Sequence, residues 1–158
     1  MAINAFIKIE GIDGASVASK HKGEIDVLSF SWGIKNETAT GGPGGGGAGK
    51  AVVTDFSFTK EISGDSPELF VSVCTGEHHK EAVLLVEGVG ADVKGKAGYY
   101  KVVFNDVLIS SVSLAGQDNS VPMEQVSLSF SKVSMEFRDG SGAGGKAASC
   151  DFSRGGDF

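Results

Sequence analysis

The sequence predicts a mainly β protein, a small antiparallel β-barrel with one short flanking α-helix. Two observations lead to this fold class. Apolar and polar residues alternate with a period of two over most of the chain, as in strands that bury one face. Helical spacing of apolar residues occurs in one short segment, which begins at Ser66 and closes at Gly76. Several strands and a single helix bury their apolar faces most simply in an antiparallel barrel or sandwich.

Length and composition indicate one domain. The chain has 158 residues, of which 41% are hydrophobic, enough for a substantial core. We assign residues 1–138 to the barrel domain, including a glycine-rich loop at 40–50, and residues 139–158 to a flexible tail rich in glycine and serine. The formal net charge of -6 argues against nucleic-acid binding, which needs clustered positive charge.

The strands follow from the alternation, taken in order. In the clearest of them, residues 25–35, Leu28, Phe30 and Trp32 share the face that we expect to be buried. The last strand changes phase near Ser131, which predicts either a bulge or burial on both sides. The expected strands are residues 6–10, 25–35, 51–60, 81–87, 99–105, 107–114 and 125–138.

The helix has start and stop signals. Ser66 supplies an N-cap hydroxyl and Pro67 occupies the first helical position. Leu69, Phe70, Val73 and Cys74 follow at helical spacing and predict a buried apolar stripe. Cys74 is therefore expected to be a buried, unreactive thiol.

The glycine-rich loop resembles a phosphate-binding loop only superficially. Gly44 to Lys50 fit the first seven positions of that motif, but Ala51 replaces the hydroxyl that would bind magnesium, and a strand follows where a helix is needed. The sequence therefore predicts no nucleotide cofactor. Ordering so many glycines costs entropy, which suggests that another subunit orders the loop.

No catalytic or metal constellation is expected. His78 and His79 follow Cys74 closely, but the second ligand pair of a structural zinc site is missing. We expect the two imidazoles to lie at the helix C-terminus, where they favour the helix dipole. A Gly-x-Ser-x-Gly elbow is absent from the sequence, and nothing marks two carboxylates as an acid and base pair.

A quieter signal is the row of hydroxyl side chains opposite the apolar face. Ser29 and Ser31 lie on the outer face of one expected strand, and Ser57 and Thr59 repeat the pattern in the next. This is either an ordinary face exposed to solvent or a wall of small polar groups lining a pore that several subunits make. Periodicity alone leaves both open.

The start of the chain has no basic segment followed by a sustained apolar run, so no cleaved signal peptide is expected. No stretch approaches the length of a membrane-spanning helix. Two cysteines do not make a disulfide framework. These features predict synthesis in the cytoplasm, without membrane insertion, and any export by a route that needs no cleaved signal.

Several segments, in order, resemble Hcp, the haemolysin co-regulated protein family of bacterial type VI secretion. The resemblance covers roughly residues 1–137. Each matching segment is common by itself, but their order and spacing together are specific to the family. Its segments are Phe6-Ile7-Lys8-Ile9, residues 11–16 and 21–33, Gly49-Lys50-Ala51, residues 55–60, Ser66-Pro67, Cys74-Thr75-Gly76 and residues 107–113.

The resemblance implies a non-enzymatic structural subunit that forms a homohexameric ring. Rings would stack into the inner tube of a contractile machine, with a spike protein at the tip, a sheath around the tube and secreted effectors in the lumen. It also implies subunit or stacking contacts for part of the loop and lumen-facing positions for two serines. The contact residues are Gly44, Gly45, Gly46, Gly47 and Lys50, and the lumen residues are Ser29 and Ser31.

Two departures and two alternatives accompany this interpretation. Pro43 stiffens the loop at one point, and the segment from Asp139 onward has no counterpart in the family pattern, so Phe152 and Phe158 receive no role.

One alternative function is the tube protein of a phage-like or extracellular contractile particle. The other is a monomeric or dimeric β-barrel that binds a small ligand, although inward Phe30 and Trp32 leave it little room.

Overall fold

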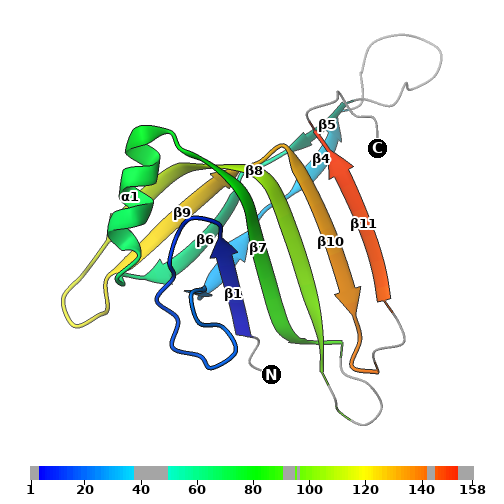
Figure 1. Cartoon of the computed structure of the whole chain (residues 1–158), viewed down its shortest axis with the longest axis horizontal. Helices are drawn as coiled ribbons and strands as arrows, with labels where there is room; N and C mark the ends of the chain where they lie inside the picture. Colours follow the sequence, from blue (N-terminus) through cyan, green and yellow to red (C-terminus); the bar gives the residue numbers. More distant parts are fainter. Residues whose placement is uncertain (1–3, 38–49, 91–94, 96, 142–144, 153–158) are drawn as a thin grey trace.

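The computed structural model describes residues 4–37, 50–90, 95, 97–141 and 145–152. This part of the chain is mainly β with one helix, which confirms the predicted class (Figure 1). The elements are β1 (Asn4–Ile9), β2 (Ile25–Val27), β3 (Ser29–Ser31), β4 (Ile34–Glu37), β5 (Lys50–Val53), β6 (Phe56–Glu61), α1 (Ser66–Thr75), β7 (His78–Val89), β8 (Gly98–Ala115), β9 (Met123–Ser129), β10 (Lys132–Arg138) and β11 (Gly145–Asp151).

One curved antiparallel sheet carries most of the strands. Its order is β2-β1-β7-β8-β9-β6-β3, with β10 and β11 extending from the first half of β8, while β4 and β5 pair separately. No ladder joins β2 to β3, so the sheet is open rather than the closed barrel expected. The strands at the two ends of the sheet order, β2 and β3, are nevertheless adjacent in the chain, because only Leu28 separates them. The Leu28 N–H donates a hydrogen bond to Thr59 O on β6 at 2.9 Å.

The single strand expected at residues 25–35 is three strands, and Leu28 was assigned to the wrong face. Ile25 and Val27 are buried, Leu28 is 56% exposed, and Phe30 then packs against the core. The buried face thus changes parity at Leu28, because the chain leaves its pairing with β1 there and joins β6 instead.

Two expected strands are one in the structure. Residues 99–105 and 107–114 fall in the 18-residue strand β8, which bends at Asp106, a residue with a φ of 53°. Before the bend β8 pairs with β10, and after it with β9. The phase change expected near Ser131 coincides with the short gap between β9 and β10, where the partner of β8 changes.

The core lies inside the curve of the sheet and is rich in aromatic rings. Phe56 and Phe104 are fully buried, with ring centroids 4.9 Å apart. Phe130 packs on Phe104 at 4.7 Å, and Trp32 meets the same ring edge-on at 5.9 Å. These contacts link the end of the sheet formed by β6 and β3 to β8 at its centre and to the segment between β9 and β10.

The helix ends at Gly76 as expected, in the left-handed conformation with a φ of 67°. It begins one residue earlier than expected, with Asp65 as the N-cap. Leu69 is buried, but Phe70 is 63% exposed and Cys74 is also exposed, so the predicted stripe is only partly correct. The helix packs on β8, but the face that it buries is narrower than its apolar stripe, because some of its apolar side chains remain exposed.

The two adjacent histidines lie at the start of β7 rather than at the helix end. His79 is buried and contacts the Ser72 hydroxyl and the Glu10 carbonyl oxygen, each at 2.7 Å. His78 points the other way, is exposed, and lies 3.2 Å from the Asp106 carboxylate. Strand geometry sends neighbouring side chains to opposite faces, so the pair cannot act together on the helix dipole.

Part of the expected flexible tail is a strand. The seven residues of β11 pair with β10 along its whole length, from Lys132 opposite Asp151 to Arg138 opposite Gly145. Phe152 then donates its N–H to Ser131 O at 2.7 Å and sets its ring against Phe130. Backbone hydrogen bonds and this aromatic anchor order a segment whose composition alone predicts mobility.

A buried ionic cluster joins β6, β9 and the start of the helix. Lys60 and Asp65 are each 1% exposed, and their charged groups lie 2.8 Å apart. Glu124, which is 3% exposed, places Oε1 3.6 Å from the same ammonium and has no hydrogen bond at that atom. The Lys60 ammonium also donates to the Glu61 carbonyl oxygen and the Ser66 hydroxyl.

We expect Lys60→Met to lower the free energy of unfolding by about 3–5 kcal/mol, because it leaves two carboxylates buried without a cation. Lys80→Met, which removes an exposed ammonium from β7, is the matched control and should change stability by about 0.5 kcal/mol or less. Urea unfolding of both variants at one protein concentration measures the difference. Equal stabilities would show that the cluster adds nothing.

Thiol labelling tests the order of β11. Cys150 is half-buried, and burial together with the charge of Asp151 raises the pKa of its thiol. Since the thiolate is the nucleophile, we expect iodoacetamide at neutral pH to label exposed Cys74 first. Labelling of Cys150, followed alone in Cys74→Ser, should accelerate as the pH rises through its raised pKa. Equally fast labelling of both cysteines at neutral pH would contradict an ordered β11.

Candidate functional site

A continuous sheet face of small polar side chains covers β3, β6, β9 and the second half of β8. The registers align two rows across it, one running from Ser31 through Ser57 and Ser127 to Ser111, the other from Ser29 through Thr59 and Gln125 to Ser113. With the neighbouring Asp55, Ser110 and Ser129, these two rows form what we call the hydroxyl face.

The alternation of these strands places the hydroxyls outside. Phe56 and Phe58 on β6, with Val126 and Leu128 on β9, point inward and are essentially inaccessible to solvent. Since successive side chains of a strand lie on opposite faces, the residues between them must point outward. The hydroxyl face is therefore the reverse side of a fully buried part of the core.

Many of the hydroxyls bond to one another. Ser57 Oγ and Ser127 Oγ are 2.9 Å apart, and Ser29 Oγ lies within hydrogen-bond distance of Thr59 Oγ1. These bonds link strands side by side through their side chains as well as through their backbones. The face consequently presents small groups whose hydrogen-bonding capacity is already partly used.

Asp55 is the charged member of the hydroxyl face. Its carboxylate accepts hydrogen bonds from Ser110 Oγ at 2.8 Å and from Ser129 Oγ at 3.3 Å. Ser110 occupies the point where the register between β8 and β9 shifts by one residue, which turns its side chain toward Asp55. The carboxylate is thus held in place although the residue is exposed.

The structure places the two serines expected on a wall together on this face. Ser29 and Ser31 are both exposed, and Ser57 and Thr59 lie beside them. Sequence reasoning missed Ser111, Ser113, Ser127 and Ser129, although the same alternation marks them. The alternation also puts Asp55 on the same face as Ser57 and Thr59, but nothing in the sequence marks its carboxylate as a hydrogen-bond partner of Ser110 and Ser129.

Of the five residues expected to make contacts in the loop, the structure describes only Lys50. Gly44, Gly45, Gly46 and Gly47 lie outside the described residues. Lys50 is the first residue of β5, where its backbone lies opposite Glu37. The pairing of β4 with β5 therefore holds the two ends of the loop next to each other.

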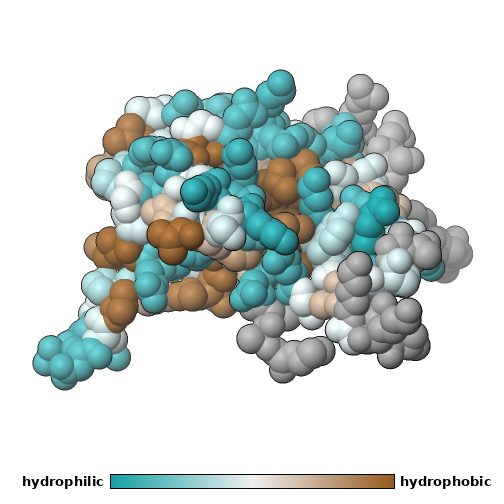
Figure 2. Space-filling model, turned by 60° about the horizontal axis from the view of Figure 1, so that its bottom comes forward, coloured by the Kyte–Doolittle hydropathy of each residue, from teal (hydrophilic) through white to brown (hydrophobic). Residues whose placement is uncertain are grey.

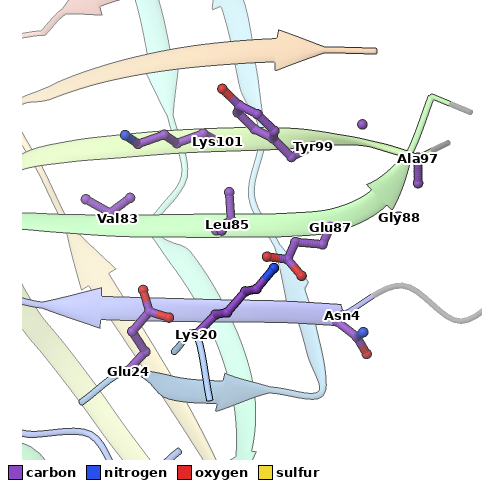
Figure 3. A pocket seen from close by; sticks show the side chains of 11 residues that line it. Asn4, Lys20, Glu24, Val83, Leu85, Glu87, Gly88, Ala97, Tyr99 and Lys101 are labelled. Carbon is purple, nitrogen blue, oxygen red and sulfur yellow. The ribbon is translucent and has the colours of Figure 1, made fainter. Parts of the chain in front are cut away.

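A concave region of about 720 Å³ lies over β1, β7 and β8, with Leu85 between charged groups of both signs (Figure 3). Two of these groups, Glu24 and Glu87, are already engaged by buried His21, whose Nε2 lies 2.9 Å from Glu87 Oε1. The remaining residues of this region provide no nucleophile with an adjacent base.

Elsewhere on the described surface, Arg138 and Glu136 form an ion pair. The Arg138 guanidinium, which donates to Glu136, lowers the pKa of that carboxyl group and has its own pKa raised. Among the described residues, no three His, Cys, Asp or Glu side chains gather closely enough to hold a metal ion. In the same part of the chain, no helix has the length and apolar character to cross a membrane.

The surface is otherwise mixed. Figure 2 shows hydrophobic residues in separate groups among hydrophilic ones, and the hydrophilic tip of the turn between β8 and β9 projects from the body. Leu114 and Val121, on either side of that tip, are 66% and 54% exposed.

Comparison with known proteins identifies the family of this chain. The family model of the type VI secretion system effector Hcp matches residues 6–137. Protein Hcp1 of Pseudomonas aeruginosa is 36% identical over 147 residues, which are 92% of this chain and 90% of that protein.

Solved structures extend the similarity to the whole fold. The crystal structure of Hcp1 from Salmonella typhimurium has a TM-score of 0.79 at 33% identity, covering 100% of each chain. A type VI secretion system effector from Yersinia pestis has a TM-score of 0.75 at 31% identity, covering 93% of this chain and 98% of that one. In sequence and in fold, the chain belongs to the Hcp family of the type VI secretion system.

Proposed function

We propose that this protein is the structural subunit of the inner tube of a type VI secretion apparatus. Six copies form a ring, the rings stack, and the hydroxyl face lines the lumen. The observation that carries the proposal is this face, a continuous sheet surface of small, mostly uncharged side chains on a member of the Hcp family. Such a wall leaves room for a protein in transit.

The role is mechanical and the subunit is exported with its cargo. The partners are copies of itself, the spike protein at the tube tip, the surrounding sheath and secreted effectors carried in the lumen. The subunit is made in the cytoplasm and leaves the cell through the machine. The rival in which a barrel binds a small ligand loses support, because Phe56, Phe58 and Phe104 fill the interior of the curved sheet.

The loop between β4 and β5 supplies contacts between subunits. Ile34 and Val52, on the two strands that hold the loop, are 52% and 37% exposed. Apolar side chains at such positions gain about 25 cal/mol per Å² when a neighbour covers them. Gly44 to Gly47 then let a neighbouring backbone approach closely, and Lys50 contacts the same neighbour.

The solution mass is the decisive test. Six copies of 16.2 kDa form a particle of about 97 kDa, which size-exclusion chromatography with light scattering measures at several concentrations. A species near that mass supports the ring. A strictly monomeric species, even when concentrated, overturns the ring as a property of the isolated protein.

We expect Gly45→Val to weaken ring formation or stacking without unfolding the barrel domain, because the added side chain blocks close approach of a neighbour. The measurements are solution mass and the melting temperature of the dissociated subunit. Ala48→Val in the same loop is the control for added bulk alone. Unchanged assembly of Gly45→Val would remove this glycine from the interface.

We expect Ser31→Gln to leave the ring intact and to reduce the amount of effector that copurifies with it, because the longer side chain narrows the lumen. Ser19→Gln, in the exposed turn before β2, is the matched control and should retain effector normally. Quantitative mass spectrometry of the purified rings compares the two. Equal retention would mean that Ser31 does not face the cargo.

A further inference from the structure

We propose that a hollow at one end of the hydroxyl face binds a lysine or arginine side chain, so that the tube favours basic cargo. The hollow measures about 370 Å³ and lies where β6 ends, beside the segment that joins β2 to β3. Leu28 and Ile62 line it together with two acidic residues, Asp26 and Glu61. The inference rests on the proposed function, because it concerns the cargo of the same face.

The hollow has the two features that a long basic side chain requires. Leu28 and Ile62 are 56% and 41% exposed and offer apolar surface to the methylene stem. Asp26 and Glu61 are exposed carboxylates that can receive the charged head. An acidic side chain would meet these carboxylates as like charges and be rejected.

Its carboxylates outnumber its cations. Lys60 also lines the hollow, but it is 1% exposed and its ammonium lies 2.8 Å from Asp65, which lines the hollow as well. These two charges compensate each other. The charges of Asp26 and Glu61 therefore set the sign of the potential that an arriving side chain meets.

Asp26 is held in position before any ligand arrives. Ser16 Oγ donates to Asp26 Oδ1 at 2.8 Å, and Ser16 is itself buried. That bond occupies one oxygen, so Oδ2 remains available to a guanidinium or ammonium. A preorganised acceptor binds with a smaller entropic cost than a mobile one.

The hydroxyl face agrees with this preference. Asp55, at the opposite end of β6 from Glu61, carries the same sign of charge. From the strand rise, the two carboxylates are separated by about 20 Å along the strand. Four strand segments carry the face: β3, β6, β9 and β8 from Leu108 onward. Their other charged residues, Lys60 and Glu124, are buried, so the only outward charge on these segments is the negative charge of Glu61.

Two labelled peptides of equal length, decalysine and decaglutamate, serve as probes for the assembled wild-type ring. The test variant is Asp26→Asn with Glu61→Gln, which keeps the shape of both side chains. The control is Glu77→Gln with Glu81→Gln, two exposed carboxylates outside the hollow, with the same change in net charge. Fluorescence anisotropy measures binding at 50 mM and at 500 mM salt.

We expect decalysine to bind the wild-type ring at 50 mM salt and to bind the test variant about tenfold more weakly. A tenfold change in Kd corresponds to about 1.4 kcal/mol of binding free energy. The control should weaken binding by less than about twofold, and decaglutamate should bind none of the proteins. At 500 mM salt the difference should disappear. The Ile62 δ1 methyl resonance should shift when decalysine is added.

Equal weakening in the test and control variants would overturn the inference, and so would an unshifted Ile62 resonance, because binding would then reflect net charge alone. Solution mass, measured on every sample, separates the two proposals. If the protein binds decalysine through Asp26 and Glu61 but stays monomeric, the hollow stands and the lumen fails. If the ring forms and the variants bind decalysine as the wild type does, only the hollow fails.

Discussion

The arrangement of this protein depends on the burial of alternate side chains in β6 and β9. Phe56, Phe58, Val126 and Leu128 fill the interior, and sliding either strand by one residue would expose them and bury hydroxyls instead. The register that protects the aromatic core is therefore the register that builds the hydroxyl face. Core packing and the candidate functional surface are two sides of one constraint, so a shift in register would disrupt both at once.

The ionic cluster of Lys60, Asp65 and Glu124 strengthens this constraint on strand register from inside the core, where charged groups are rare. Lys60 lies on β6 directly opposite Glu124 of β9, and Asp65 is the N-cap of the helix. Apolar contacts are tolerant of small shifts, whereas a buried ammonium requires its carboxylates at defined distances. The cluster therefore fixes how the helix meets the sheet behind the hydroxyl face, and it fixes the end of β6 at which the hollow forms.

Much of the fold was predictable from the sequence because one period dominates it. Alternation located most strands and put Ser29 and Ser31 on an outer face, and ordered motifs indicated the family. Local pattern failed where tertiary partners decide the outcome. Leu28 changed face because its strand exchanged β1 for β6, and residues 145–151 formed β11 because β10 offered an unpaired edge. The hollow was beyond prediction, since Asp26 and Glu61 meet only through the fold.

The mutual bonding of the hydroxyls has a kinetic consequence. Ser57 pairs with Ser127, Ser29 with Thr59, and Asp55 takes the hydrogens of two further serines. A protein that touches such a wall must compete with the bonds that these groups already make, so each such contact is weaker and is easily exchanged for the next. A conduit benefits from this lack of adhesion, because a load that is held tightly on the way in is also slow to leave. In the proposed tube, the face would let cargo slip past, with retention confined to the proposed hollow at one end.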